Sequence, residues 1–197
     1  MIFFAGHHNT GKSTAAVFLK ENYGFCHIET GAIVRNLYIK SKSRLPFGEW
    51  ANQHKHFFDE AIVMEIKKCA KNLAQPNRKT EDIIITGNRQ IEGIHYIIDH
   101  IKPLNGRENL IVYFEANLRI LHARHMARTD RPTTRLSFDE FVNDLLNYDQ
   151  KMGVEKIKEY AHITIRNEDS IQNLLELVVR ELRFKGYNLP KVLELDL

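Results

Sequence analysis

The stretch that decides the fold of this 197-residue chain is residues 6–13, Gly-His-His-Asn-Thr-Gly-Lys-Ser. It matches the pattern G-x-x-x-x-G-K-[ST], in which the glycines permit a tight turn and successive backbone N–H groups face one phosphate chain. An apolar segment, Ile2–Ala5, precedes it directly, and a helical pattern, Ser13–Asn22, follows it directly. This strand–loop–helix context is typical of a phosphate-binding loop, or P-loop, and the helix N-terminus favours anions. The motif therefore predicts a nucleotide site in which Lys12 contacts the β- and γ-phosphates and the Ser13 hydroxyl binds Mg²⁺.

Apolar runs and turn signals alternate along the rest of the chain in a strand-then-helix order. The apolar runs predict strands over 2–5, 25–28, 83–86, 110–114 and 163–165. Helical patterns cover 13–22, 32–41, 57–74, 91–101, 117–128, 138–148 and 170–184, and residues 42–48 are predicted to form a loop. This order indicates an α/β fold with a doubly wound, five-stranded parallel sheet. Ligands of such folds bind beyond the carboxyl ends of the strands, so the loops after Ala5, Ile28, Thr86, Glu115 and Ile165 are expected to carry the chemistry.

Length and composition indicate an ordinary globular chain of one domain. Hydrophobic residues make up 43% and charged residues 27%, which excludes a disordered tail protein, a collagen-like chain and a small disulfide scaffold. The 28 basic and 25 acidic residues leave a net charge of +3, too small to indicate a nucleic-acid partner. No apolar run of about 18 residues and no signal peptide occur, so we expect no membrane partner. Cys26 and Cys69 are far apart in sequence and are expected to be separate buried thiols in a reducing cytoplasm.

Two further segments resemble adenylate kinase-like nucleoside monophosphate kinases. In that group a Thr-Gly pair opens the helix after the second strand, and an Arg one turn later holds the acceptor's phosphate; Thr30, Gly31 and Arg35 match this pattern. Residues 86–89, Thr-Gly-Asn-Arg, are similar to the group's Asp-Gly-x-x-Arg signature with altered spacing. The Gly-x-Arg form fits best a branch of small adenylate-kinase-like and dephospho-CoA-kinase-like proteins. Thr86 stands where an acid that supports Mg²⁺ is usual in the group.

The end of the chain resembles the same branch. Arg124, Arg128 and Arg131 resemble the arginines of a kinase lid, which neutralise the charge that develops on the transferred group and exclude water. Residues 148–153 and 161–170 look like the segment that leads, through a short helix and an Asn-containing turn, into the last helix. The resemblance spans residues 1 to about 182. It implies one P-loop kinase domain over residues 1–197, with an acceptor-binding insertion at about 30–75, a small helical lid at about 124–136, and a monomeric or homodimeric state.

The P-loop and the resemblance together assign roles to individual residues. ATP binding is expected of Gly6, Asn9, Thr10, Gly11, Lys12, Ser13, Thr14 and Asn167. Acceptor binding is expected of Glu29, Thr30, Gly31, Arg35, Gly87 and Arg89. Catalytic roles are expected of Lys12, Arg124, Arg128 and Arg131, with Ser13 as the Mg²⁺ ligand. The implied reaction transfers the γ-phosphoryl of MgATP to a small phosphorylated acceptor, a nucleoside or deoxynucleoside monophosphate.

Glu29 keeps a second acceptor class open. A kinase that acts on an alcohol, such as dephospho-CoA, needs a base near the attacking oxygen, and Glu29 is placed to supply one. The alternative interpretation of Glu29 is a cap for the helix that follows it. A third hypothesis, a nucleotide-binding regulatory module without turnover, follows from Thr86 in place of an acid. Glu115 is a weaker candidate for the Mg²⁺ shell.

The remaining histidine and aromatic residues give weaker signals. His7 and His8 are predicted to be neither metal ligands nor bases, and the pairs His54/His56 and His122/His125 are predicted to lie on the surface. Trp50, Phe57 and Phe58 are predicted to belong either to the core or to the wall of an acceptor pocket.

Overall fold

The computed structural model describes residues 1–73, 82–103, 106–129, 134–145 and 149–189. At its centre is a five-stranded parallel sheet with the strand order β2-β3-β1-β4-β5. The strands are β1 (Ile2–Gly6), β2 (Cys26–Glu29), β3 (Ile83–Thr86), β4 (Leu110–Glu115) and β5 (Ile163–Arg166). The predicted doubly wound parallel sheet is confirmed, and each strand lies within one residue of its predicted bounds.

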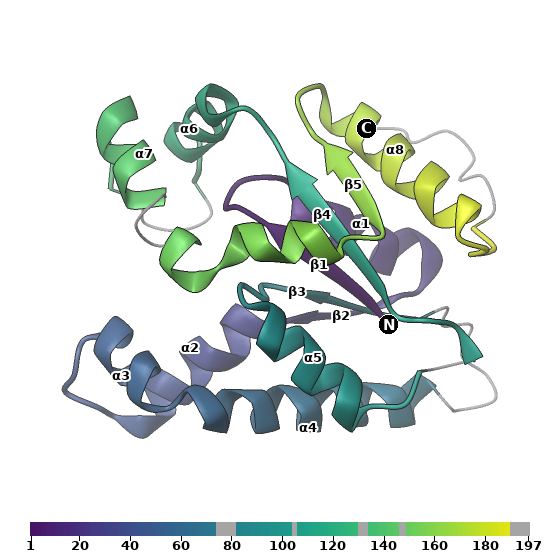
Figure 1. The fold of residues 1–197 in the computed structure, drawn as a ribbon, viewed down its shortest axis with the longest axis horizontal. Coiled ribbons are helices and arrows are strands. Elements are labelled where there is room, and N and C mark those ends of the chain that lie inside the picture. The colour runs from purple at the N-terminus through teal and green to yellow at the C-terminus, as the bar shows by residue number, and fades with distance from the viewer. Residues whose placement is uncertain (74–81, 104–105, 130–133, 146–148, 190–197) are drawn as a thin grey trace.

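Helices cover both faces of the sheet (Figure 1). They are α1 (Lys12–Tyr23), α2 (Thr30–Ser41), α3 (Phe47–Gln53), α4 (Lys55–Leu73), α5 (Ile91–His100), α6 (Leu118–Met126), α7 (Phe138–Leu145) and α8 (Ile171–Phe184), together with a 3-10 helix, η3 (Val154–Tyr160). Among the described helices, none combines the length and the apolar character that crossing a membrane requires.

The alternation of side chains along each strand divides the core into two layers. Phe4 and Val112 face α1 and α8, while their neighbours Phe3 and Ile111 face α4, α5 and η3. All four side chains are buried, because helices cover both faces of a parallel sheet. This packing explains why the strands read as continuous apolar runs rather than as alternating ones.

Two helical groups extend beyond the carboxyl ends of the strands and flank the P-loop (Figure 1). One consists of α2, α3 and the start of α4, next to β2 and β3. The other consists of α6 and α7, which follow β4 and share a small apolar cluster of Leu121, Phe141 and Leu145. The predicted insertion and lid therefore lie on opposite sides of the phosphate-binding loop.

The predicted loop over 42–48 is wrong at its end, because α3 begins at Phe47. Pro46, with φ −54°, directly precedes this helix, and its fixed backbone angle suits a helix start. The helix predicted over 117–128 is shorter, since the Asn117 side chain accepts a hydrogen bond from the Arg119 N–H and caps α6. The predicted helix ends at 74 and 146–148 lie outside the described residues.

The prediction of two separate thiols is also wrong, because Cys26 and Cys69 form a disulfide. Cys26 lies on β2 and Cys69 on α4, and these elements pack together in the core. Their Cα atoms are 6.7 Å apart, within the range that a disulfide spans. A sequence separation of 43 residues concealed this pairing, since nothing local brings the two cysteines together.

Candidate active site

The P-loop connects β1 to α1, as its sequence context predicts. Gly6 and Gly11 have φ angles of 125° and 91°, in the region that favours glycine. A Cβ atom on Gly11 would lie 2.6 Å from Nδ2 of Asn167, so no larger residue fits there. The buried hydroxyl of Thr10 donates to the His7 carbonyl at 2.8 Å and closes the turn.

The Lys12 ammonium lies at the centre of this loop. It donates to the Gly6 carbonyl at 2.9 Å, to the Thr10 hydroxyl at 3.0 Å and to the His7 carbonyl. Burial, and after it the positive charge of Arg89, lowers the pKa of Lys12 to about 7. A polyphosphate placed here would favour the charged ammonium, because a nearby opposite charge raises the pKa of a cation.

A cavity of about 770 Å³, the nucleotide pocket, opens over the P-loop. Its lining includes seven of the eight residues predicted to bind ATP, namely Asn9, Thr10, Gly11, Lys12, Ser13, Thr14 and Asn167. Gly6 forms the start of the loop beneath them. The pocket also has an apolar wall of Ile171 and Leu174 on α8, which sequence reasoning missed. A pair of aliphatic side chains on an amphipathic helix looks like core until the fold places it beside the P-loop.

Two arginines, Arg124 on α6 and Arg128 just after its end, reach across to the P-loop. Arg124 donates to the Asn167 side chain at 3.1 Å and to the Asn9 carbonyl at 3.4 Å, and Arg128 donates to the Asn9 side chain at 3.1 Å. Asn167 in turn donates to the Thr10 carbonyl at 3.0 Å. The predicted lid arginines 124 and 128 thus line the nucleotide pocket together with the loop. Arg131 lies outside the described residues.

The histidines of α6 hold α7 in place instead of lying on the surface, which corrects the prediction for this pair. His122 hydrogen-bonds the Leu136 carbonyl at 2.8 Å, and His125 hydrogen-bonds the Thr134 carbonyl at 2.9 Å. Both half-buried rings pack against Phe141. The two histidines therefore connect α6, which carries Arg124, to α7 and the residues before it.

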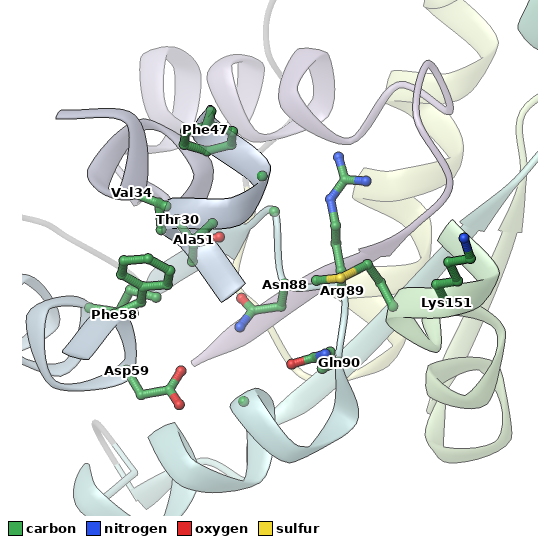
Figure 2. Close-up of a pocket in the computed structure, with 15 residues that line it drawn as sticks. Thr30, Val34, Phe47, Ala51, Phe58, Asp59, Asn88, Arg89, Gln90 and Lys151 are labelled. Carbon is green, nitrogen blue, oxygen red and sulfur yellow. The ribbon is translucent and has the colours of Figure 1, made fainter. Parts of the chain in front are cut away.

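A second cavity of about 440 Å³, the acceptor pocket, lies between α2, α3, α4 and the loop after β3 (Figure 2). Its lining is Thr30, Val34, Phe47, Gly48, Ala51, Phe58, Asp59, Ile62, Gly87, Asn88, Arg89, Gln90, Gly93, Lys151 and Met152. Gly87 and Arg89 also line the nucleotide pocket, so the two cavities share part of their wall.

Of the aromatic residues on α3 and at the start of α4, one lines the acceptor pocket and another lies in the core behind it. Phe58 lines the acceptor pocket, and the buried Trp50 packs behind it at 5.3 Å between ring centroids. His54 is half-buried and stacks on Trp50 at 4.8 Å, so its predicted surface position is wrong. The side chains of His56 and Phe57 lie outside the described part of the structure.

Glu29 and Arg35 form an ion pair of 2.9 Å, with side chains 41% and 48% exposed. Both line the nucleotide pocket rather than the acceptor pocket. Glu29 occupies the cap position of α2, but its side chain makes no capping hydrogen bond. The pair therefore lies at the side of the nucleotide pocket, between the P-loop and α2.

Asp149 organises a network that sequence reasoning missed. Its carboxylate is fully buried and binds His7 at 3.0 Å, His8 at 3.2 Å and Arg89 at 2.6 Å. Arg89 also hydrogen-bonds His8. The two loop histidines thus anchor the P-loop to a buried carboxylate, a structural role that the sequence analysis did not predict. Arg89, predicted to bind the acceptor, is held between the two pockets by the same contact.

Burial would raise the pKa of Asp149, but hydrogen bonds from His7 and His8 and the positive charge of Arg89 hold it well below its usual range. Burial lowers the pKa of His8, against the opposing hydrogen bond to Asp149. The network therefore favours an ionised Asp149 beside a neutral His8.

The side chains of Thr86 and Glu115, considered above for the Mg²⁺ shell, do not meet at one site. Thr86 is buried and its hydroxyl hydrogen-bonds His27 at 2.9 Å. Glu115 pairs with Lys158 at 2.5 Å and does not line the nucleotide pocket. Within the described ranges, no group of three or more His, Cys, Asp or Glu side chains is arranged to hold a metal ion.

Solved structures with the same fold include small kinases. A shikimate kinase from Bacteroides thetaiotaomicron superposes with a TM-score of 0.60 at 13% identity, covering 92% of this chain and 97% of the other. A shikimate kinase from Aquifex aeolicus and a gluconokinase from Sinorhizobium meliloti 1021 each give a TM-score of 0.55 at 14% identity, with 94% of this chain and 97% of theirs covered. These similarities establish a P-loop kinase fold.

The sequence comparisons give one family. No curated protein sequence matches the chain. A family model described as an AAA domain matches residues 5–140, which include the P-loop, the group of α2, α3 and the start of α4, the whole of α6, and Arg124 and Arg128. The chain therefore belongs to this AAA domain family.

Proposed function

We propose that the protein is an ATP-dependent small-molecule kinase that transfers the γ-phosphoryl of MgATP to an acceptor in the acceptor pocket. The observation that carries the proposal is the shared wall of the two pockets, where Gly87 and Arg89 line both. Phosphoryl transfer needs little covalent work from the protein, but it needs two substrates held in line and charge stabilised between them. A P-loop on one side of Arg89 and a mixed polar and apolar cavity on the other meet both needs.

The nucleotide pocket supplies the cations for the transferred group. Lys12, Arg124, Arg128, Arg89 and Arg35 all line it, against the carboxylate of Glu29. We assign the phosphates to the P-loop and the nucleotide's base to the wall of Ile171 and Leu174. Cations around the γ-phosphate stabilise the charge that spreads over its oxygens during transfer.

Mg²⁺ fits the donor set of this pocket. The Ser13 hydroxyl lines it at the start of α1, and Glu29 and Thr86 add oxygen donors. Mg²⁺ is usually held by one or two protein oxygens together with substrate phosphates and water, so no dedicated cluster is required. When bound, the ion would neutralise charge on the phosphates. We assign Ser13 as its protein ligand.

A nucleoside or deoxynucleoside monophosphate is the acceptor that we propose first. Arg89 lies where the pockets meet and Arg35 on α2 lines the nucleotide pocket with it, so two guanidinium groups are available to an acceptor phosphate. The acceptor pocket beyond them has aromatic and aliphatic walls formed by Phe47, Phe58 and Ile62. Its volume of about 440 Å³ is sufficient for a small ligand that contains a ring.

An alcohol acceptor, as in dephospho-CoA kinase-like transfer, is the second candidate. Glu29 favours it, since its carboxylate lines the same pocket as Lys12 and could take the proton of an attacking hydroxyl. The similar structures are named for shikimate and gluconate, which both carry hydroxyl groups. The third hypothesis, a regulatory module, predicts nucleotide binding without turnover.

A coupled ADP-release assay separates these proposals. The panel contains nucleoside and deoxynucleoside monophosphates, dephospho-CoA, shikimate and gluconate, each with MgATP. We expect turnover with at least one monophosphate above the ATPase background. Turnover with an alcohol alone would favour the second candidate. ATP binding by calorimetry without turnover of any acceptor would favour the regulatory module.

A further inference from the structure

Two polar residues that have no part in the proposed function contact Arg89. His8 is the third residue of the P-loop, and the buried Asp149 belongs to the segment that precedes η3. Arg89 extends from the loop after β3 and lines both pockets (Figure 2). Three segments that are far apart in the sequence therefore meet at one guanidinium group.

The two terminal nitrogens of the Arg89 guanidinium contact different partners. Nη1 donates to Oδ1 of Asp149 at 2.6 Å, and Nη2 contacts Nε2 of His8. Nδ1 of His8 in turn lies 3.2 Å from Oδ2 of Asp149. A neutral imidazole with its proton on Nδ1 satisfies both of its contacts, since it donates to the carboxylate and accepts from the guanidinium. Burial, the largest cause, lowers the pKa of His8 and favours this neutral form.

The carboxylate that holds Arg89 is itself fixed in place. The side chain of Asp149 is fully buried, and its Oδ2 lies 3.0 Å from Nδ1 of His7 as well as 3.2 Å from Nδ1 of His8. Both carboxylate oxygens of Asp149 are therefore hydrogen-bonded. A side chain that packing and hydrogen bonds lock in this way can hold a neighbouring functional group in a productive geometry.

A cation at the boundary of the two pockets needs such support, because its neighbours repel it. Lys12, Arg124 and Arg128 line the nucleotide pocket together with Arg89. Burial lowers the pKa of Lys12 to about 7, and the positive charge of Arg89 adds to this effect, whereas Asp149 opposes it. Without its two partners, the flexible arginine side chain would have to be ordered against this repulsion each time a substrate binds.

We propose that Asp149 and His8 are positioning residues, which hold Arg89 at the boundary of the two pockets for phosphoryl transfer. This inference rests on the proposed function and gives both residues a role in it. The side chain of Arg89 is 26% exposed, so its guanidinium stays accessible to a substrate while it is held. The same arrangement serves a phosphate or an alcohol acceptor, because the transferred group is anionic in both cases.

A double-mutant cycle tests whether Asp149 and His8 act through Arg89. The measured quantity is kcat/KM for an acceptor that gives turnover, at saturating MgATP, so that weaker ATP binding does not enter. We expect Arg89→Ala and Asp149→Asn each to lower it about ten- to a hundredfold, and His8→Leu about three- to tenfold. In the Arg89→Ala background, Asp149→Asn and His8→Leu should each change it by less than about twofold, since their partner is already lost.

Two further variants separate positioning from a general effect on the fold. A glutamine side chain offers an oxygen that can accept from Arg89, so His8→Gln should retain most of the activity that His8→Leu loses. The His8 side chain is 31% exposed, so the melting temperature of both variants should stay close to that of the wild type. Asp99→Asn removes a carboxylate from an exposed position of α5 and should change neither activity nor stability.

The possible outcomes distinguish this inference from the proposed function. Losses that multiply in full in the Arg89→Ala background would show that Asp149 and His8 act on the P-loop instead, and would overturn the inference alone. A His8→Gln variant as slow as His8→Leu would overturn the role of His8. If the wild type phosphorylates no acceptor, the kinase proposal fails and this inference fails with it.

Discussion

At the residue scale, the Lys12 ammonium lies under P-loop carbonyls, where burial and Arg89 lower its pKa to about 7. The unfolded chain, with a lysine pKa of about 10.4, binds that proton more tightly, so the charge destabilises the fold at neutral pH. We expect Lys12→Met to abolish ATP turnover while the free energy of unfolding at pH 7 is unchanged or higher. ADP release and urea denaturation measure the two quantities. Turnover that persists in a folded Lys12→Met variant would contradict the kinase proposal.

The charge of Asp149 has the opposite effect on stability to that of Lys12. Despite its burial, His7, His8 and Arg89 hold its pKa well below the usual range. Such an acid stabilises the fold above its unfolded pKa of about 3.9, and that contribution is lost as the pH falls below this value. We expect Asp149→Asn to lower the free energy of unfolding by about 2–4 kcal/mol at neutral pH, because a buried charge network loses its centre. The difference in the free energy of unfolding between the wild type and Asp149→Asn should decrease as the pH falls below about 4.

Urea denaturation near pH 7, 5 and 3 checks this expectation, with the exposed Asp99→Asn as the control. A wild-type advantage that stays constant down to the lowest pH would show that the Asp149 contacts do not stabilise its ionised form.

At the scale of elements, the group of α6 and α7 is expected to open locally while the sheet stays intact. Phe141 on α7 is buried, but its cluster with Leu121 and Leu145 is separate from the two core layers. Phe141→Ala, a substitution that typically costs about 3–5 kcal/mol in a core, should therefore act on local opening. We expect faster hydrogen exchange in α6 and α7, unchanged exchange in β1 and β4, and a lower kcat. Exchange that rises equally in the sheet would place α7 in the same cooperative unit as the core.

The elements that could be predicted from the sequence are long or buried on both faces, whereas those that were missed are short helices. Ile83–Thr86 was predictable because a continuous run of β-branched residues is typical of a strand buried on both faces. The short helices α3 and η3 have seven residues each, too few for a periodic pattern to stand out. Proline commonly marks a loop, but Pro46 occupies the N-cap position here and α3 begins directly after it, at Phe47.

At the scale of the whole molecule, topology alone brings the site together. The parallel sheet places every strand's carboxyl end at one edge, so the rule for open α/β folds predicted which loops line the pockets. Contacts between side chains on distant segments were not predictable. Asp149 binds His7 across 142 positions and Arg89 across 60, and neither contact has a local signal. Asp59 and Asn88 likewise read as ordinary polar residues until α4 and β3 are packed together.

The Cys26–Cys69 disulfide is a long-range contact that joins β2 to the helix that carries Phe58 and Asp59. Closing a loop of 43 residues restricts the unfolded chain, which is worth about 4 kcal/mol in the chain-entropy description. We expect Cys69→Ser to lower the free energy of unfolding by about 2–4 kcal/mol relative to the oxidised wild type. Urea denaturation with and without a thiol reductant measures the effect.

The reductant itself is the matched control. Reduced wild type should unfold at the urea concentration of Cys69→Ser, and the variant should not respond to reductant. Because the bond constrains α4, the same treatment should also weaken acceptor binding more than ATP binding, as calorimetry with each substrate would measure. A wild type whose unfolding midpoint is the same in both buffers would mean that the two cysteines contribute as packed thiols and not as a bond.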